Sequence, residues 1–334
     1  MVGTVHTKHV NGTQPTGNII SELGHRWSDG GDSLDAICRY ALMPAGKLFR
    51  PMLMVESALA VGGTIAHVLP AAVGSEYGHT ASLIHDDIID CDELRRGRPS
   101  VFSRYGIEDA IVAGDALIFH LFLCLAECRR AGAPAERVVR ALEIAATAGL
   151  DMCRGQHLES EITKNSIRDR DRYLRMVDLK SAALFRSACQ CGVVLGGGLE
   201  ASVRSMGGYG TGLGVAFQII DDLFAFTDDG SVTGKHPASD VRNRRLTLPL
   251  ILVYESADPV AVRLLDDAFS GELGDQEALA AATKAVERTG VLDICRKVAL
   301  EHITSAKDEL LLLPDTPSRD RLGQLADDAV ERVR

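Results

Sequence analysis

The chain has 334 residues, of which 46% are hydrophobic and 25% charged, so it can bury a large core and is not disordered as a whole. Its 46 acidic residues outnumber its 36 basic residues, and the net charge of −10 argues against a nucleic-acid-binding protein. The eight cysteines include no CxxC pair, so the usual spacings of zinc sites and thioredoxin-like motifs are absent.

Residues 1–32 are predicted to form a flexible N-terminal segment, and the pattern becomes helical from Ser33 onward. The predicted helices, in chain order, are 35–42, 51–61, 70–94, 108–130, 135–161, 169–196, 204–227, 246–255, 259–269, 276–289, 292–312 and 315–334. Neither strand–helix alternation nor a repeat of 20–50 residues is visible. We therefore predict that residues 33–334 form a single all-α domain.

The sequence also bears on location. The N-terminus lacks the apolar stretch of a signal peptide. The longest apolar stretch, residues 116–126, is interrupted by His120 and is too short to cross a bilayer. These features predict a cytoplasmic protein without a transmembrane segment.

The strongest local motif is Asp86-Asp87-Ile88-Ile89-Asp90. Asp86 and Asp90 are four residues apart, so on a helix they share a face, where their charges repel unless a cation lies between them. Carboxylate oxygens, with room for water and phosphate, suit Mg²⁺. The alternative is a solvated acidic helix end, but the preceding residues 80–84 are small or apolar, which disfavours it.

A second acidic pair, Asp221-Asp222, ends the apolar run 214–220. One pair at the end of an apolar helix can be accidental. Two such pairs indicate facing helices that bracket a site with several metal ions, with a diphosphate as the bridging ligand.

Basic residues occur at matching places along the chain, and Arg forks or Lys point charges can bind phosphate oxygens. They are Lys47, Arg50, Arg95, Arg96, Lys180, Lys235, Arg242, Arg244 and Arg245. Any one of them can also be an ordinary surface residue, with its aliphatic part packed on the protein and its charged group in water. Lys180 is the hardest to explain in that way, because its helix is otherwise small and apolar.

Several segments together identify a family. They are GKLFRP (46–51), HTASLIHDDIIDCDELRRGRPS (79–100), AGDAL (113–117), GQHLE (155–159), LKSAALF (179–185), GVAFQIIDDL (214–223), TGKHPASD (233–240) and RRLTLP (244–249). In order and spacing the set resembles the trans-isoprenyl diphosphate synthases of the polyprenyl synthetase family, over about residues 45–257. The resemblance implies a single antiparallel α-helical bundle around a deep central cavity, and a homodimer with residues 108–130 as the candidate interface.

The resemblance also implies roles for individual residues. Three Mg²⁺ ions would be held by Asp86, Asp90 and Asp221, supported by Asp87, Asp222 and Asp240. The allylic diphosphate would be bound by Arg95, Lys180 and Lys235. Isopentenyl diphosphate would be bound by Lys47, Arg50, His79 and Arg96. The reacting carbons would be lined by Ser181 and Gln218. No side chain is expected to serve as a dedicated base, because in the family the released diphosphate takes the proton.

Two positions depart from the family pattern. Ala225 stands where the second acidic motif usually has its third Asp, and we expect weaker metal binding without loss of activity. Arg244-Arg245 replace the usual Gly-Lys, and Arg245 keeps the charge needed for a diphosphate ligand.

Product length depends on the cavity wall. Ala81 and Ser82 precede the first acidic motif and are small, which in this family opens the cavity beyond a C15 product. Phe119 on the next helix is expected to form a floor, or else to be an ordinary core aromatic. Small walls with a bulky floor favour geranylgeranyl diphosphate (C20), with a longer chain as the alternative.

Three other functions are compatible with parts of the sequence. A class I terpene cyclase shares the fold and metal chemistry but does not need the isopentenyl diphosphate pocket, whose residues are present here. A regulatory subunit should lose the first acidic motif, which is intact. A prenyltransferase acting on a non-isoprenoid acceptor should lack some of the basic residues that bind isopentenyl diphosphate.

Overall fold

The computed structural model describes residues 15–27, 31–227 and 239–331. The first half comprises α1 (Pro15–Arg26), α2 (Ser33–Leu42), α3 (Phe49–Ala60), α4 (Ile65–Asp90), β1 (Leu94–Arg95), β2 (Arg98–Pro99), α5 (Val101–Tyr105), α6 (Ile107–Glu127) and α7 (Ala135–Lys164). The second half comprises α8 (Arg170–Val177), the π-helix η1 (Asp178–Ala182), α9 (Ala183–Gly196), α10 (Glu200–Thr227), α11 (Ser239–Arg242), α12 (Leu248–Glu255), α13 (Pro259–Phe269), α14 (Asp275–Thr289), α15 (Val291–Leu310) and α16 (Pro317–Val330).

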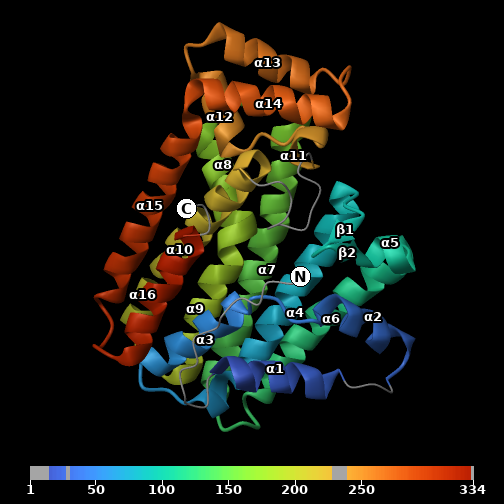
Figure 1. Cartoon of the computed structure of the whole chain (residues 1–334). Helices are drawn as coiled ribbons and strands as arrows, with labels where there is room; N and C mark the ends of the chain where they lie inside the picture. Colours follow the sequence, from blue (N-terminus) through green and yellow to red (C-terminus); the bar gives the residue numbers. More distant parts are fainter. Residues whose placement is uncertain (1–14, 28–30, 228–238, 332–334) are drawn as a thin grey trace, which may run out of the picture.

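The predicted all-α bundle is confirmed. Long helices run side by side, α13 and α14 lie across one end, and α1 lies across the other (Figure 1). Helix α4 packs against α6, α10 packs against α9 and α15, and α7 packs against α9 and η1. Buried side chains from Ile19 to Ala329 form one hydrophobic cluster, from which we infer that the described helices make a single domain.

The N-terminal segment differs from the prediction, because residues 15–26 form α1 instead of a flexible lead-in. Ile19, Leu23 and Trp27 recur at helical spacing and are buried in the core. Arg26 donates a hydrogen bond to Glu127 of α6 at 2.6 Å, which ties α1 to the bundle. Residues 1–14 and 28–30 lie outside the described residues.

Helix α6 has one apolar face against α4 and a second apolar face that the chain leaves exposed. The exposed large side chains are Ile107, Ile111, Val112, Phe119 and Leu123. By length and composition α6 is also the one helix in the described ranges that could cross a membrane, a weak criterion that core helices also meet. Phe119 is 70% exposed and does not line the central cavity, so the prediction that it forms the cavity floor is wrong for this chain.

Candidate active site

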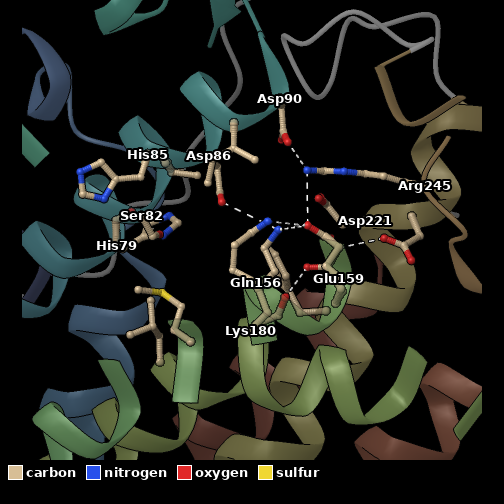
Figure 2. Close-up of a pocket in the computed structure, with 18 of the residues that line it drawn as sticks. His79, Ser82, His85, Asp86, Asp90, Gln156, Glu159, Lys180, Asp221 and Arg245 are labelled. Atoms are coloured by element: carbon tan, nitrogen blue, oxygen red, sulfur yellow. Dashed lines mark hydrogen bonds and ion pairs between the residues drawn. The ribbon is translucent and has the colours of Figure 1, made fainter. Parts of the chain in front are cut away.

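A cavity of about 950 Å³ opens in the middle of the bundle. Its walls come from α3, α4, α7, η1, α9, α10 and residues 239–247. Charged side chains from four of these segments converge at one side of it, and Figure 2 shows Asp86, Asp90, Lys180, Asp221 and Arg245 pointing toward the same space. This cavity is the candidate for the deep central cavity that the family resemblance implies.

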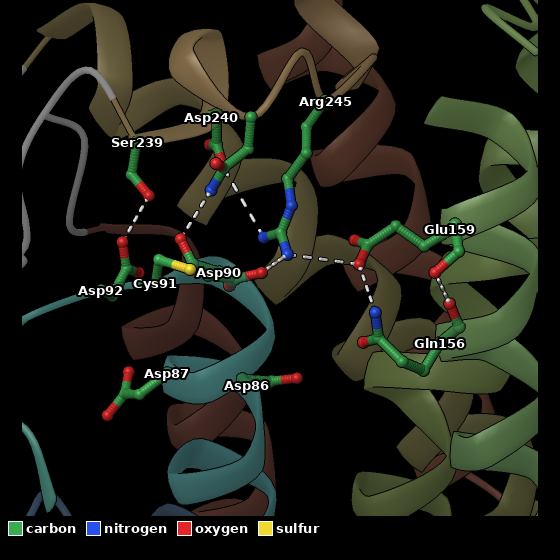
Figure 3. Close-up of polar contacts among 12 residues, drawn as sticks. Asp86, Asp87, Asp90, Cys91, Asp92, Gln156, Glu159, Ser239, Asp240 and Arg245 are labelled. Atoms are coloured by element: carbon green, nitrogen blue, oxygen red, sulfur yellow. Dashed lines mark hydrogen bonds and ion pairs between the residues drawn. The ribbon is translucent and has the colours of Figure 1, made fainter. Parts of the chain in front are cut away.

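The first acidic motif lies in the last turns of α4. Asp86 and Asp90 both line the cavity, as their four-residue spacing predicts. Asp87 does not line it: its buried carboxylate accepts a hydrogen bond from Arg95 Nε at 2.9 Å. Figure 3 shows Asp86 and Asp87 turned to opposite sides of the helix. The structure therefore does not group Asp87 with the candidate metal ligands.

The hairpin after α4 presents the next two basic residues. Strands β1 and β2 pair antiparallel, with Arg95 opposite Arg98, so the turn consists of Arg96 and Gly97 alone. Both turn residues have positive φ, +54° and +73°, as a type I′ turn requires. The turn separates the two bases: Arg95 reaches Asp87, while Arg96 points toward the Pro44 carbonyl. Both side chains line the cavity.

The second acidic motif lies on α10. Asp221 is exposed to the cavity, whereas Asp222 is buried and accepts hydrogen bonds from Tyr173 Oη at 2.6 Å and Gln218 Nε2 at 2.8 Å. Burial, reinforced by Asp240 and Asp221, raises the pKa of Asp222 to about 8 against the opposing effect of its two hydrogen bonds. Asp222 also borders the cavity, but its carboxylate is held by these two hydrogen bonds. Tyr173 was not predicted, because no local pattern connects it to α10.

Lys180 and Ser181 lie in the π-helix η1, a rare local geometry that often marks functional sites. Ser181 Oγ donates to Gln218 Oε1 at 2.7 Å, which joins the two residues predicted to line the reacting carbons. Lys180 Nζ lies 3.8 Å from Asp86 Oδ1 and donates to Glu159 Oε2 at 2.7 Å. The π-turn thus places a base beside the first acidic motif.

Close packing of α7 against η1 fixes this base. A Cβ added at Gly155 of α7 would lie 2.4 Å from the Lys180 backbone nitrogen, closer than real contacts allow. We expect Gly155→Ala to lower the free energy of unfolding by about 2 kcal/mol, as overpacked cores do, and to lower kcat as well.

Urea unfolding and steady-state kinetics measure both effects. Gly149→Ala is the matched control on the same helix, because nothing lies within 4 Å of its added Cβ. It should raise the free energy of unfolding by roughly 0.5–1 kcal/mol. Equal changes in the free energy of unfolding in the two variants would show that the contact between α7 and η1 does not require glycine at position 155.

Arg245 and Glu159 form the centre of the polar network (Figure 3). Arg245 is hydrogen-bonded to Asp90 and lies 3.4 Å from Glu159 Oε2 and 3.8 Å from Asp240 Oδ1. From the sequence, Arg245 was predicted as a site residue but Glu159 was not. Its position in the GQHLE segment, three residues after Gln156, was the available signal.

A second group of bases also lines the cavity: Lys47, Arg50, His79 and Arg96. The Arg50 Cζ atom lies 4.3 Å from the Phe185 ring centroid, and desolvation lowers the pKa of Arg50 to about 10, against the effect of Glu76 and Asp221. Burial and the neighbouring arginines hold the pKa of His79 well below its usual value, so the ring is neutral. The buried Glu76, one turn before His79, was also missed.

Backbone strain concentrates around the site. In the described ranges five non-glycine residues have positive φ, and four of these adjoin the candidate ligands: Leu48, Cys91, Arg96 and Arg244. Such conformations cost about 1–3 kcal/mol each and persist where the surroundings enforce them. Their positions beside Lys47, Asp90 and Arg245 indicate that the fold holds these side chains in fixed directions.

The remaining predicted residues fall into two groups. Lys235 lies outside the described residues, as do the neighbouring 228–238. Ser82 lines the cavity, whereas Ala81 is buried and is not among the lining residues.

The donor set fits Mg²⁺, though no complete cage exists. Within the described ranges, no three His, Cys, Asp or Glu side chains are close enough to hold a metal ion by themselves. Asp86, Asp90 and Asp221 nevertheless line one cavity from two helices. Mg²⁺ typically takes one or two protein carboxylates and completes its octahedron with water and substrate phosphates. This arrangement suits a metal that arrives together with a diphosphate.

Comparison with known proteins decides the family. The sequence profile for Polyprenyl synthetase matches residues 32–286. The chain belongs to this family. As a polyprenyl synthetase family member it is a prenyltransferase that forms prenyl diphosphates.

Its relatives make prenyl diphosphates of different lengths. A geranylfarnesyl diphosphate synthase of Natronomonas pharaonis is 34% identical, with 90% of each chain covered. A geranylgeranyl diphosphate synthase of Methanosarcina mazei is 33% identical, with 88% of each chain covered. The crystal structure of a polyprenyl synthase from Caulobacter crescentus, complexed with calcium and isoprenyl diphosphate, has a TM-score of 0.88 and 27% identity, covering 96% of this chain and 95% of that one.

Proposed function

We propose that the protein condenses isopentenyl diphosphate head-to-tail with an allylic diphosphate, and that the described cavity is the site of the reaction. The observation that carries the proposal is that two groups of bases line the same cavity as the acidic motifs. Arg95, Lys180 and Arg245 pair with carboxylates of the first acidic motif, whereas Lys47, Arg50 and Arg96, with His79, form the second group. We propose that each group binds one diphosphate.

We propose one substrate for each group. The allylic diphosphate binds between the acidic motifs, where Lys180 and Arg245 contribute cations that stabilise the departing diphosphate. Isopentenyl diphosphate binds to the second group, with His79 donating or accepting a hydrogen bond as a neutral ring. Diphosphate leaves to give an allylic cation, the double bond of isopentenyl diphosphate attacks that cation, and the released diphosphate takes the proton lost from the resulting cation.

Magnesium would supply charge stabilisation of the leaving diphosphate, and Asp86, Asp90 and Asp221 would hold it. We propose three ions. Asp222 would support their ligands through its hydrogen bond from Gln218, and Asp240 would do so through its ion pair with Arg245. The hydrogen-bonded pair of Ser181 and Gln218 borders the space between the two substrates. The apolar wall beyond them keeps water from the allylic cation.

This arrangement favours condensation over the alternatives. A terpene cyclase has one diphosphate substrate and no use for the second group of bases. A regulatory subunit has no use for an intact first acidic motif whose Asp86 and Asp90 line the cavity. Ala225 also lines the cavity, so the missing third Asp leaves a small apolar surface there.

We propose geranylgeranyl diphosphate (C20) as the main product, although its length depends on a side chain other than Phe119. Met152 precedes Gln156 by one turn on α7, and Ser82 precedes Asp86 by one turn on α4. Both line the cavity beyond its charged side. One and two turns earlier on the same face of α7 are the small residues Ala145, Ala148 and Gly149, so we propose that Met152 is the bulky side chain that limits the product. A longer product is the second candidate, because Phe119 does not close the cavity.

We therefore expect Met152→Ala to lengthen the main product by at least one isoprene unit and Met152→Phe to shorten it. The measurement is chromatography of the dephosphorylated alcohols made from labelled isopentenyl diphosphate and farnesyl diphosphate with Mg²⁺. Leu150→Ala, an exposed residue of the same helix outside the cavity, serves as the control and should leave the product unchanged. If both Met152 variants give the wild-type product, Met152 does not limit chain length. If a hydrocarbon forms from a single diphosphate, the cyclase alternative replaces condensation.

The exposed apolar face of α6 supports a further proposal about assembly. Its five large side chains would be costly to leave in water, and a second copy of the chain would cover them. We propose a homodimer through this face and a cytoplasmic location. Sedimentation velocity tests the dimer, and Phe119→Asp should shift the protein toward the monomer.

A further inference from the structure

Lys180 and Arg245, the two basic side chains proposed to bind the allylic diphosphate, are already paired with protein carboxylates. Glu159 Oε2 accepts hydrogen bonds from Lys180 Nζ at 2.7 Å and from Gln156 Nε2 at 3.1 Å. Arg245 Nη2 lies 3.4 Å from the same oxygen. The side chain of Glu159 is only 14% exposed. One carboxylate oxygen thus joins two bases from segments far apart in the sequence.

Glu159 is charged in this position. Burial would raise its pKa, but Lys180 and Arg245 outweigh burial and lower it. Separating a buried ion pair costs free energy, because it leaves a buried charge without an opposite charge beside it. An incoming diphosphate must therefore compete with Glu159 for both cations.

Each of the two cations also contacts a carboxylate of the first acidic motif. Arg245 is hydrogen-bonded to Asp90, and Lys180 lies 3.8 Å from Asp86. Magnesium ions at Asp86 and Asp90 would take over the neutralisation of these carboxylates. Arg245 and Lys180 would then share Glu159, and Arg245 would also keep Asp240 at 3.8 Å, so fewer carboxylates would compete with a diphosphate.

We propose that Glu159 is a positioning residue that makes diphosphate binding depend on Mg²⁺. Without metal it keeps Lys180 and Arg245 neutralised, and with metal it holds them in place while they bind phosphate oxygens. The inference rests on the proposed function only in requiring that the site binds a diphosphate. It adds a residue that acts through Lys180 and Arg245, not on the substrate.

The test is isothermal titration of the full-length protein with inorganic diphosphate, once in EDTA and once in Mg²⁺ at constant ionic strength. For the wild type we expect Mg²⁺ to strengthen binding by about 100-fold, at the upper end of usual coupling between sites. Glu159→Gln should bind diphosphate in EDTA about tenfold more tightly than the wild type, because the competing charge is gone. The effect of Mg²⁺ should shrink accordingly.

Two further variants separate geometry from total charge. Glu161→Gln removes the same charge from an exposed position of α7 that faces only His157 at 3.9 Å, and it should behave like the wild type. Glu159→Asp keeps the charge but is too short to reach both cations, so it should lie between the wild type and Glu159→Gln. It also provides the answer if the Gln variant fails to fold.

The results distinguish a failure of the role of Glu159 from a failure of the proposed function. If both Glu159 variants bind diphosphate in EDTA as weakly as the wild type and respond equally to Mg²⁺, the role of Glu159 is refuted. The same holds if Glu161→Gln gives the full effect. A wild-type protein that binds no diphosphate in Mg²⁺ would contradict the proposed function itself, and this inference with it.

Discussion

Asp86→Asn is expected to lower kcat/KM by about 1,000-fold, the usual upper cost of removing one group that stabilises charge in a transition state. Asp86 lines the cavity on α4, 3.8 Å from Lys180 and one turn before Asp90. The amide keeps the shape of the side chain but removes the charge that would hold Mg²⁺. The loss should fall mainly on kcat, because the metal acts on the leaving diphosphate.

The measurement is steady-state kinetics over a range of Mg²⁺ concentrations, with thermal unfolding as a check on folding. Asp86 is partly exposed, so the melting temperature should change little. Asp293→Asn is the control, since that side chain is 87% exposed on α15 and pairs only with Arg296. An Asp86→Asn enzyme that keeps activity within about threefold of the wild type would rule out a metal role for the motif.

Arg50→Gln is expected to raise KM for isopentenyl diphosphate by about 100-fold while KM for the allylic substrate changes little. Truncating one partner of a desolvated charge pair usually costs 2–5 kcal/mol, and about 2.7 kcal/mol corresponds to this factor. Among the described residues the Nε atom of Arg50 has no hydrogen-bond partner although it is buried, so the guanidinium has capacity for a ligand. Its place over the Phe185 ring keeps the group in one orientation.

Loss of Arg50 also removes one of the two basic groups near the buried Glu76, which lowers the free energy of unfolding. The double variant Arg50→Gln/Glu76→Gln separates this effect, since it removes both charges together. Arg50→Lys keeps the charge but loses the planar fork, and its KM should be intermediate. If KM rises for the allylic substrate instead, the assignment of the two groups of bases must be exchanged.

The sequence predicted the site best where one helix carries the pattern. Asp86 and Asp90 share a face of α4 because of their spacing, and both reach the cavity. Lys180 stood out because a base inside an apolar helix needs a partner. The π-turn that aims it could not be predicted, since an i→i+5 turn depends on packing against α7 at Gly155.

The errors arose where function depends on contacts between distant segments. Glu159 meets Lys180 and Arg245 only after three segments converge. Phe119 lies on an apolar helix, but periodicity does not tell which apolar face the chain itself covers. Helix α1 was missed because its three anchoring residues, Ile19, Leu23 and Trp27, are spaced within a short polar segment.

The central claim is that two diphosphates react in one cavity, and the stoichiometry of diphosphate release tests it most directly. Inorganic diphosphate and labelled isopentenyl diphosphate would be followed together in the presence of Mg²⁺ and geranyl or farnesyl diphosphate. We predict equal amounts of diphosphate released and isopentenyl diphosphate consumed, and no release when isopentenyl diphosphate is left out. Rapid release from the allylic substrate alone, without incorporation of label, would contradict the account.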